Sequence, residues 1–322
     1  MQQERARQES GDPGGSTSVA PIVQPNAGPE RPQKTNDNLR PPAISAIMAL
    51  HNRVDLMDAS IKSILDQDEP DFELIVIDDA SSDGSWESAQ RWAKSDSRIR
   101  LDRFATNRGI SAVRNRGVEL ARGRYLATCD SDDLARPQRF RLQREVLDAD
   151  SGVVGVGGQL WCFVGDPAID GWLPHWHFGL RDGRQPFSFA GGMLRTEAVR
   201  QFGYDPTLRV AEDLDLAYKL STVGTFVDLP DIVIDYRIHS GGISSKNRTL
   251  EWDNLRAQLR GLRLLNGRFS LRGYLVLGQS LLRATAATLG FGARKQRQAR
   301  IARSGGGQTG ARTPADFPDS PS

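Results

Sequence analysis

The sequence predicts an α/β fold: a single domain with a mostly parallel central sheet flanked by helices. Between residues 43 and 149, short apolar runs alternate with stretches whose apolar residues recur at helical spacing. Three of these apolar runs end in polar or acidic residues, as strands do at the ligand-binding edge of a parallel sheet. With 322 residues, 38% of them hydrophobic, the chain can bury a sizeable core.

The elements follow from these patterns. In the first half, strands are predicted at residues 43–50, 72–77, 99–104 and 125–129, and helices at 57–65, 85–94, 111–121 and 137–149. The second half is less regular, with one strand or two in 153–164, a long loop at 165–185, strands at 187–194, 226–229 and 232–238, and helices at 197–202, 213–222, 248–265 and 270–290.

Composition divides the chain into four parts. Residues 1–42 are rich in Pro, Gly, Gln and charge and lack apolar periodicity, so we expect a disordered N-terminal segment. Residues 43–247 hold the alternating pattern and form the predicted folded domain. Residues 248–303 form a predicted C-terminal helical extension. Residues 304–322, which contain three glycines in a row and three prolines, are predicted to be a disordered tail.

Charge and cysteine content narrow the class of protein. The formal net charge of +2 gives no reason to expect a nucleic-acid partner. Two cysteines, Cys129 and Cys162, fit a reducing compartment better than a disulfide scaffold. The N-terminus has no apolar signal-peptide core, and the most apolar stretch, residues 271–291, is interrupted by Arg272 and Arg283. These features predict a cytoplasmic protein.

Acidic and polar residues follow three predicted strands, as Leu50-His51-Asn52, Asp78-Asp79 and Asp130-Ser131-Asp132. Carboxylates crowded on one sheet edge repel one another unless a cation or hydrogen-bond donors stabilise them. Asp130 and Asp132 supply hard oxygen ligands suited to Mg²⁺ or Mn²⁺, which would neutralise a diphosphate leaving group. The alternative is a solvated turn. Asp79 could accept a hydrogen bond from a nucleobase or cap the helix that begins near residue 85.

Two other nucleotide-binding classes lack their signatures. The first predicted strand is followed by His51-Asn52-Arg53, without the Gly-x-Gly-x-x-Gly turn of dinucleotide-binding domains. The sequence also has no Gly-x-x-x-x-Gly-Lys-Ser/Thr run. Hydride transfer and P-loop hydrolysis are therefore disfavoured.

A series of motifs resembles the inverting family 2 glycosyltransferases, which have the GT-A fold, over about residues 43–245. Each motif is weak alone, but the order and spacing of the whole series are specific. In chain order the motifs are Ile44 to Asn52, Ser63-Ile64-Leu65-Asp66-Gln67, Phe72 to Asp79, Ser82-Asp83-Gly84-Ser85, Asn107 to Asn115, Asp130-Ser131-Asp132-Asp133, Ala211 to Leu216, and Tyr236 to Ser240.

The resemblance implies a nucleoside-diphosphate sugar as donor and a metal ion as cofactor. By position, the implied nucleotide-binding residues are Leu50, Asn52, Asp79, Arg114, Asp130 and Ser131. The implied metal site has Asp132 as its main ligand, with Asp130 and His239 beside it. His239 could equally be a hydrogen-bonded structural histidine, and Arg114 a solvated helix residue.

The resemblance further implies that Asp213 is the general base, with Glu212 beside it. In an inverting transfer one carboxylate removes the proton of the acceptor hydroxyl as that oxygen attacks the anomeric carbon. Another explanation is that both acids stabilise a helix N-terminus, where negative charge favours the dipole. The implied acceptor is a saccharide or a lipid-linked molecule in polysaccharide or glycolipid assembly.

The end of the chain allows two interpretations. An apolar side in residues 270–290 precedes Arg294, Lys295 and further arginines up to residue 303. Residues 270–303 could therefore make a peripheral contact with the inner face of the plasma membrane. Alternatively, the helix packs on the catalytic domain and the basic end is solvated.

Two rival functions remain at this stage. A non-catalytic sugar-nucleotide-binding module would keep the pocket without the chemistry, although the presence of both Asp132 and Asp213 argues against it. A nucleotidyltransferase would have a Gly-rich signature with Arg or Lys after its first strand, and the sequence has none.

Overall fold

A computed structural model describes residues 40–174, 178–239 and 250–288. The predicted disordered segments 1–42 and 304–322 lie outside these residues, except for residues 40–42. The part of the predicted C-terminal extension beyond residue 288 also lies outside them.

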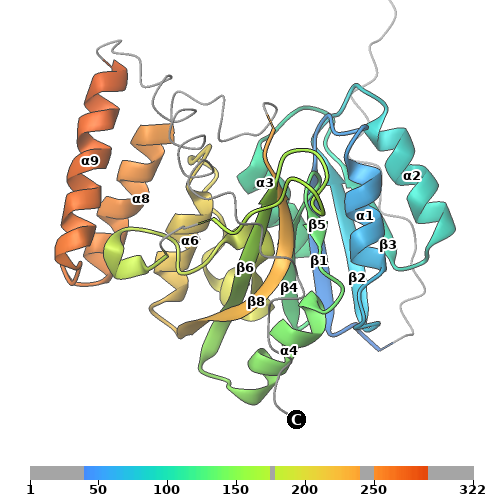
Figure 1. Ribbon diagram of the computed structural model, residues 1–322, viewed down its shortest axis with the longest axis horizontal. Coiled ribbons are helices and arrows are strands. Elements are labelled where there is room, and N and C mark those ends of the chain that lie inside the picture. Colours follow the sequence, from blue (N-terminus) through green and yellow to red (C-terminus); the bar gives the residue numbers. More distant parts are fainter. Residues whose placement is uncertain (1–39, 175–177, 240–249, 289–322) are drawn as a thin grey trace, which may run out of the picture.

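The described residues form one eight-stranded sheet with helices on both faces, which confirms the predicted α/β class (Figure 1). The strand order is β3-β2-β1-β4-β7-β6-β8-β5. Strand β1 pairs in parallel with β2 and β4, β2 pairs in parallel with β3, and β6 pairs in parallel with β8. Strand β7 is antiparallel to its neighbours β4 and β6, and β5 is antiparallel to β8. The strands are β1 (Ile44–Leu50), β2 (Phe72–Asp78), β3 (Ile99–Arg103), β4 (Tyr125–Asp130), β5 (Leu134–Ala135), β6 (Val153–Phe163), β7 (Met193–Arg195) and β8 (Thr225–Arg237).

The first four strands agree with the prediction to within one residue, whereas three corrections are needed further along the chain. Residues 187–194 are not one strand, because a 3-10 turn, η2 (Phe189–Gly191), precedes the short β7. The two strands predicted at 226–229 and 232–238 are a single strand, β8. The register of its pairing with β6 shifts between Gly157 and Leu160 of β6. The two-residue β5 was not predicted.

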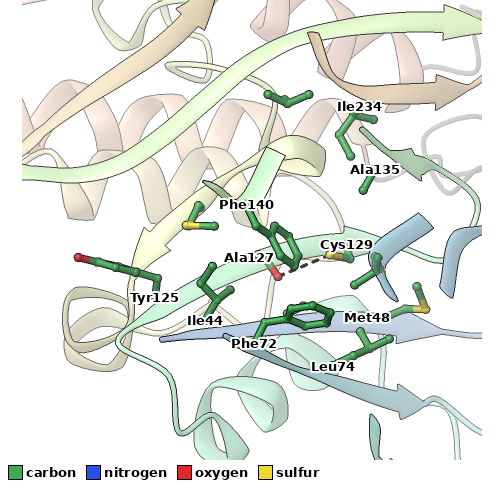
Figure 2. Packing of buried hydrophobic residues seen from close by; sticks show 14 of the residues in the cluster. Ile44, Met48, Phe72, Leu74, Tyr125, Ala127, Cys129, Ala135, Phe140 and Ile234 are labelled. Atoms are coloured by element: carbon green, nitrogen blue, oxygen red, sulfur yellow. Dashed lines mark hydrogen bonds between the residues drawn. The ribbon is translucent and has the colours of Figure 1, made fainter. Parts of the chain in front are cut away.

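Two layers of helices cover the sheet. The buried side chains of α1 (Met57–Leu65), α2 (Ser85–Ser95) and α4 (Arg139–Ala149) belong to one apolar cluster. Buried apolar side chains of α3 (Ile110–Leu120), α5 (Thr196–Phe202) and α6 (Glu212–Leu220) contribute to a second cluster. Figure 2 shows the first cluster, where Phe72 and Phe140 meet edge to face with ring centroids 5.4 Å apart.

Close packing of α3 on β1 depends on a glycine. A Cβ atom at Gly117 would lie 2.4 Å from Cγ2 of Ile47, so no larger residue fits without a shift. This contact sets the distance of α3 from the sheet, and α3 carries Arg114 toward the strand ends.

Two helices follow the sheet, α8 (Leu250–Leu264) and α9 (Leu271–Thr288). A small cluster that includes Leu214, Tyr218 and Ala257 joins α6 to α8, and α9 lies outside α8 (Figure 1). Among the residues that the structure describes, no helix combines the length and apolar character needed to cross a membrane.

Candidate active site

The predicted binding segments meet at one edge of the sheet. β1 lies between β2 and β4, and the last residue of β1, Leu50, is in register with Asp78 of β2. The parallel neighbour β4 ends at Asp130 on the other side. The segments that follow these strands, which contain Asn52 and Asp79, therefore start from the same edge, where ligands bind in open α/β sheets.

Arg114 joins this edge to the start of α6. Its Nη1 donates to Glu212 Oε1 at 2.7 Å and to Asp213 Oδ1, and its Nη2 lies 3.7 Å from Asp130 Oδ1. Burial alone would lower the pKa of Arg114, but the carboxylates of Asp213 and Glu212 outweigh burial and raise this pKa well above its ordinary value. The structure thus brings together acids that are more than eighty residues apart in sequence around one buried cation.

The two acids of α6 differ in their environment. Burial, and then the charge of Asp213, raise the pKa of Glu212 to about 7, against the opposing effect of Arg114. At neutral pH the Glu212 carboxyl therefore keeps part of its proton. The Asp213 side chain is 14% exposed. The Glu212 side chain is slightly less exposed, at 9%.

Non-glycine residues with positive φ lead into the site at three points. They are Asn52 (51°), Ala80 (59°) and Ala211 (64°). Asn52 and Ala80 lie two positions after the ends of β1 and β2, and Ala211 immediately precedes the acids of α6. Such conformations cost of order 1–3 kcal/mol and persist only where surrounding contacts enforce them. Their position next to the acids favours a functional explanation.

A second group of charges surrounds Asp132. Its Oδ2 accepts a hydrogen bond from Arg53 Nε at 3.1 Å and lies 2.9 Å from His239 Nε2. Burial raises the pKa of the neighbouring Asp130 to about 6; Arg114 opposes this rise, whereas Asp132 adds to it. The 2.9 Å distance between Asp132 Oδ2 and His239 Nε2 shows that these two predicted metal ligands are in contact.

The surroundings of Asp133 indicate whether a cation suits the charged residues around Asp132. Burial and the charges of Asp130 and Asp132 raise the pKa of Asp133 well above its ordinary value. Its Oδ1 accepts the backbone N–H of Arg237 at 2.8 Å, but its buried Oδ2 has no hydrogen-bond partner among the described residues. A divalent cation nearby would stabilise these crowded carboxylates, so the residues present fit such an ion.

The donor set is incomplete on its own. Within the described ranges, no group of three His, Cys, Asp or Glu side chains is arranged to hold a metal ion. Mg²⁺ is commonly held by one or two carboxylates together with substrate phosphates rather than by an all-protein cage. The arrangement therefore suits an ion that is shared with a bound diphosphate.

Asp79 holds the loop that leads into α3. Its two carboxylate oxygens accept the backbone N–H groups of Arg108 at 2.6 Å and Gly109 at 2.8 Å. It does not cap α2, the alternative considered from sequence, because the N–H of Ser85 donates to Asp83 Oδ1 at 3.0 Å. Asp79 thereby fixes the approach to the helix that carries Arg114, and each of its oxygens keeps acceptor capacity.

The other nucleotide-binding candidates lie around Asp79. The carbonyl oxygen of Leu50 accepts the backbone N–H of Asp79 at 2.8 Å, and the Leu50 side chain lies in the core. Asn52 Oδ1 accepts the N–H of Ser82 at 2.9 Å. Ser131 is buried between the two aspartates of the β4 end. These contacts join the segments that follow β1 and β2 into one rigid edge.

Three site residues were not predicted. Arg53 directly follows the predicted Asn52, and Asp133 completes the run that begins at Asp130, so position along the chain was an available signal for both. Tyr204 contacts Arg114, whose Cζ lies 5.5 Å from the ring centroid. Tyr204 lies in an irregular stretch between α5 and α6, and no sequence pattern points to it.

Comparison with known families fits this geometry. The family model described as Glycosyl transferase family 2 matches residues 45–189, which hold β1 to β6 and the acidic strand ends. This match identifies residues 45–189 as a glycosyl transferase family 2 segment, and with relatives that are named glycosyltransferases it makes the chain a glycosyltransferase.

Individual relatives agree with this assignment. TuaG of Bacillus subtilis (strain 168), a putative teichuronic acid biosynthesis glycosyltransferase, is 36% identical over 106 residues, which are 33% of this chain and 42% of TuaG. The succinoglycan biosynthesis protein ExoO of Rhizobium meliloti (strain 1021) is 29% identical over 256 residues, which are 72% of this chain and 70% of ExoO. The match to TuaG thus spans less than half of that protein.

The fold is shared with a solved enzyme structure. The mannosyltransferase PcManGT of Pyrobaculum calidifontis, in complex with GDP-Man and Mn²⁺, superposes with a TM-score of 0.57. The alignment covers 82% of this chain and 80% of PcManGT at 20% identity. At this identity the likeness establishes the GT-A fold and nothing finer.

Proposed function

We propose that this protein is an inverting glycosyltransferase that moves a sugar from a nucleoside-diphosphate sugar to a hydroxyl acceptor. The observation that carries the proposal is the contact of Arg114 with Asp130 at the β4 end and with Glu212 and Asp213 at the start of α6. A donor-binding strand end and a candidate base thereby belong to one charge network.

In the proposed reaction, Asp213 removes the proton of the acceptor hydroxyl as its oxygen attacks the anomeric carbon. The nucleoside diphosphate leaves from the opposite face, so the step is a single displacement without a covalent sugar intermediate. Arg114 orients Asp213, because the two groups are hydrogen-bonded. We assign the base role to Asp213 rather than Glu212 because Asp213 holds the position that the family resemblance gives to the general base.

We propose that the nucleotide lies along the edge formed by Leu50, Asn52, Asp79 and Ser131. Arg114 contributes to this donor site through Asp130, because its Nη1 is already bonded to the acids of α6. The structural relative with GDP-Man and Mn²⁺ supports a sugar-nucleotide donor.

We further propose Mg²⁺ or Mn²⁺ as cofactor, held by Asp130, Asp132 and His239. When bound, such an ion neutralises charge on the diphosphate leaving group. The contact of Asp132 with His239 and the partnerless Oδ2 of Asp133 support this site. Arg53, which contacts Asp132 directly, balances part of the negative charge of the group.

For the acceptor, we propose a saccharide or lipid-linked molecule in polysaccharide or glycolipid biosynthesis. The names of TuaG and ExoO, which refer to teichuronic acid and succinoglycan biosynthesis, support this class. We place the protein in the cytoplasm, peripheral at the inner face of the plasma membrane, where a lipid-linked acceptor is accessible.

The test is release of nucleoside diphosphate from a panel of sugar nucleotides with Mn²⁺, with and without added acceptor saccharides. We expect release by the wild-type protein and a loss of at least a hundred-fold on Asp213→Asn, in line with the typical contribution of a general base. Nucleotide binding, measured by calorimetry, should be retained. Glu119→Gln, an exposed acid of α3, is the matched control and should behave as wild type.

The outcomes separate enzyme from binding module. Nucleotide binding without release from any donor would favour a non-catalytic sugar-nucleotide-binding module. Wild-type release by Asp213→Asn would remove Asp213 from the mechanism. Product analysis by NMR tests inversion, because retention of the anomeric configuration contradicts a single displacement.

A further inference from the structure

Helix α9 packs its small residues inward and its large apolar residues outward. Gly273, Ser280 and Ala284 are buried, and a Cβ atom at Gly273 would lie 2.2 Å from the carbonyl oxygen of Arg181. The outward side chains are Leu271 (81% exposed), Tyr274 (46%), Leu275 (60%), Leu281 (50%) and Leu282 (71%). This is the reverse of the usual amphipathic arrangement, in which the large apolar residues face the core.

The exposed residues form one continuous stripe. Leu271, Leu275 and Leu282 are separated by four and seven positions, and Tyr274 and Leu281 by seven, so they lie on one side of the helix. The helix has 18 residues and is therefore about 27 Å long. In Figure 1, α9 is the outermost element at one end of the molecule, beside α8. A large exposed apolar patch marks an interaction surface.

The sequence of α9 and of the residues that flank it holds only positive charges. From residue 254 to residue 315 the sequence contains no aspartate or glutamate, but twelve arginines and lysines. Because the whole chain has a formal net charge of only +2, the positive charge is concentrated here. Arg272 and Arg283 of α9 are exposed.

We infer that the outward face of α9 docks on an anionic lipid surface. The leucines enter the boundary between headgroups and acyl chains, and the arginines contact lipid phosphates. This inference extends the proposed function, because a lipid-linked acceptor would be presented at the same surface.

A second copy of this chain fits the face less well. A symmetric contact would bring identical arginines together, and the segment holds no acid with which they could pair. A nucleic acid would use the arginines but leave the exposed leucines in water. An anionic lipid surface matches both the apolar stripe and the arginines beside it.

The experiment is co-sedimentation of the full-length protein with vesicles. We expect binding to vesicles of phosphatidylcholine containing phosphatidylglycerol, and much weaker binding to phosphatidylcholine alone. Leu275→Ser and Leu282→Ser should each lower the vesicle partition coefficient by roughly ten-fold, the effect of one leucine leaving an apolar environment. Arg283→Gln should lower it by roughly five-fold, and added salt should shrink that difference.

Two matched controls lie away from α9. Val223→Ser alters an exposed apolar residue in the turn after α6, and Arg91→Gln removes a charge from α2, at the opposite end of the molecule (Figure 1). Both variants should bind vesicles as wild type does. All the changed side chains are exposed, so thermal unfolding should be unaltered in each variant.

Unchanged vesicle binding by Leu275→Ser and Leu282→Ser would overturn the inference. So would sedimentation equilibrium showing a wild-type dimer that Leu275→Ser dissociates, with no vesicle binding, because the face would then belong to a second copy. Release of nucleoside diphosphate in lipid-free buffer is measured in parallel. Its absence in the wild type counts against the proposed function alone, whereas vesicle binding is an independent readout.

Discussion

Replacement of Glu212 by glutamine should flatten the pH dependence of folding stability. The pKa of Glu212 is raised from its ordinary value of 4.5 to about 7, first by burial and then by the charge of Asp213. Above pH 4.5 the unfolded chain releases this proton, whereas the folded chain keeps it until about pH 7. Stability is therefore lost as the pH rises through this window.

The size of the effect follows from the two pKa values. At ~1.4 kcal/mol per pH unit between them, ionisation of Glu212 lowers the free energy of unfolding by about 3 kcal/mol between acid and neutral pH. Glutamine keeps the volume and a hydrogen-bond acceptor for Arg114 but cannot ionise.

The assay is urea unfolding of wild type and Glu212→Gln at several pH values from 5 to 8. The wild-type free energy should fall by about 3 kcal/mol more than that of the variant across this range. Glu197→Gln, an exposed acid of α5, is the control for the change in net charge and should follow the wild type. Parallel curves for wild type and Glu212→Gln would refute the reasoning.

Three further substitutions test other contacts. Burial alone would raise the pKa of Asp205, but hydrogen bonds, among them one from Arg260 at 2.7 Å, lower this pKa to about 2. Asp205→Asn should therefore lower the free energy of unfolding by about 2 kcal/mol at pH 7, and the difference should vanish as the pH falls through 2. An undiminished difference in acid would contradict this prediction. Gly117→Ala should lower the free energy of unfolding by about 1–3 kcal/mol, because its Cβ would overlap Ile47; a neutral result in urea unfolding would mean that α3 moves easily. Ala211→Gly should raise stability by up to ~1 kcal/mol by relieving a φ of 64°; a loss of more than this would show that the alanine side chain packs usefully.

The first half of the fold was predictable because its signals are local. Each buried parallel strand is a short apolar run, and each helix between the strands repeats its apolar residues at helical spacing. The segment 187–194 was misassigned for a related reason. Phe187 and Phe189 are buried, but a buried 3-10 turn and a buried strand both appear as apolar runs. The short β5 depends on its pairing with β8, about a hundred residues away, and leaves no local pattern.

The candidate site was predictable in part. The acids at the ends of β2 and β4 follow from topology, because parallel neighbours end at a common edge. The partners of Arg114 could not be derived from periodicity, since Glu212 is 98 positions away and only the folded chain brings the two side chains together. A solvated Arg114, one alternative from sequence, is wrong: its side chain is 9% exposed.

Glu212 and Asp213, at the start of α6, could stabilise the helix or take part in the proposed reaction. Acids at a helix N-terminus gain 0.3–1 kcal/mol from the dipole, and up to ~2 kcal/mol when partly buried, and this gain lowers a pKa. The pKa of Glu212 moves in the opposite direction, to about 7, so burial and the adjacent Asp213 outweigh the dipole. Ala211, with its positive φ, adds a further cost at the same point. Helix stability alone therefore does not explain two acids here, and the proposed base role of Asp213 gives the pair a second reason to lie beside a buried arginine.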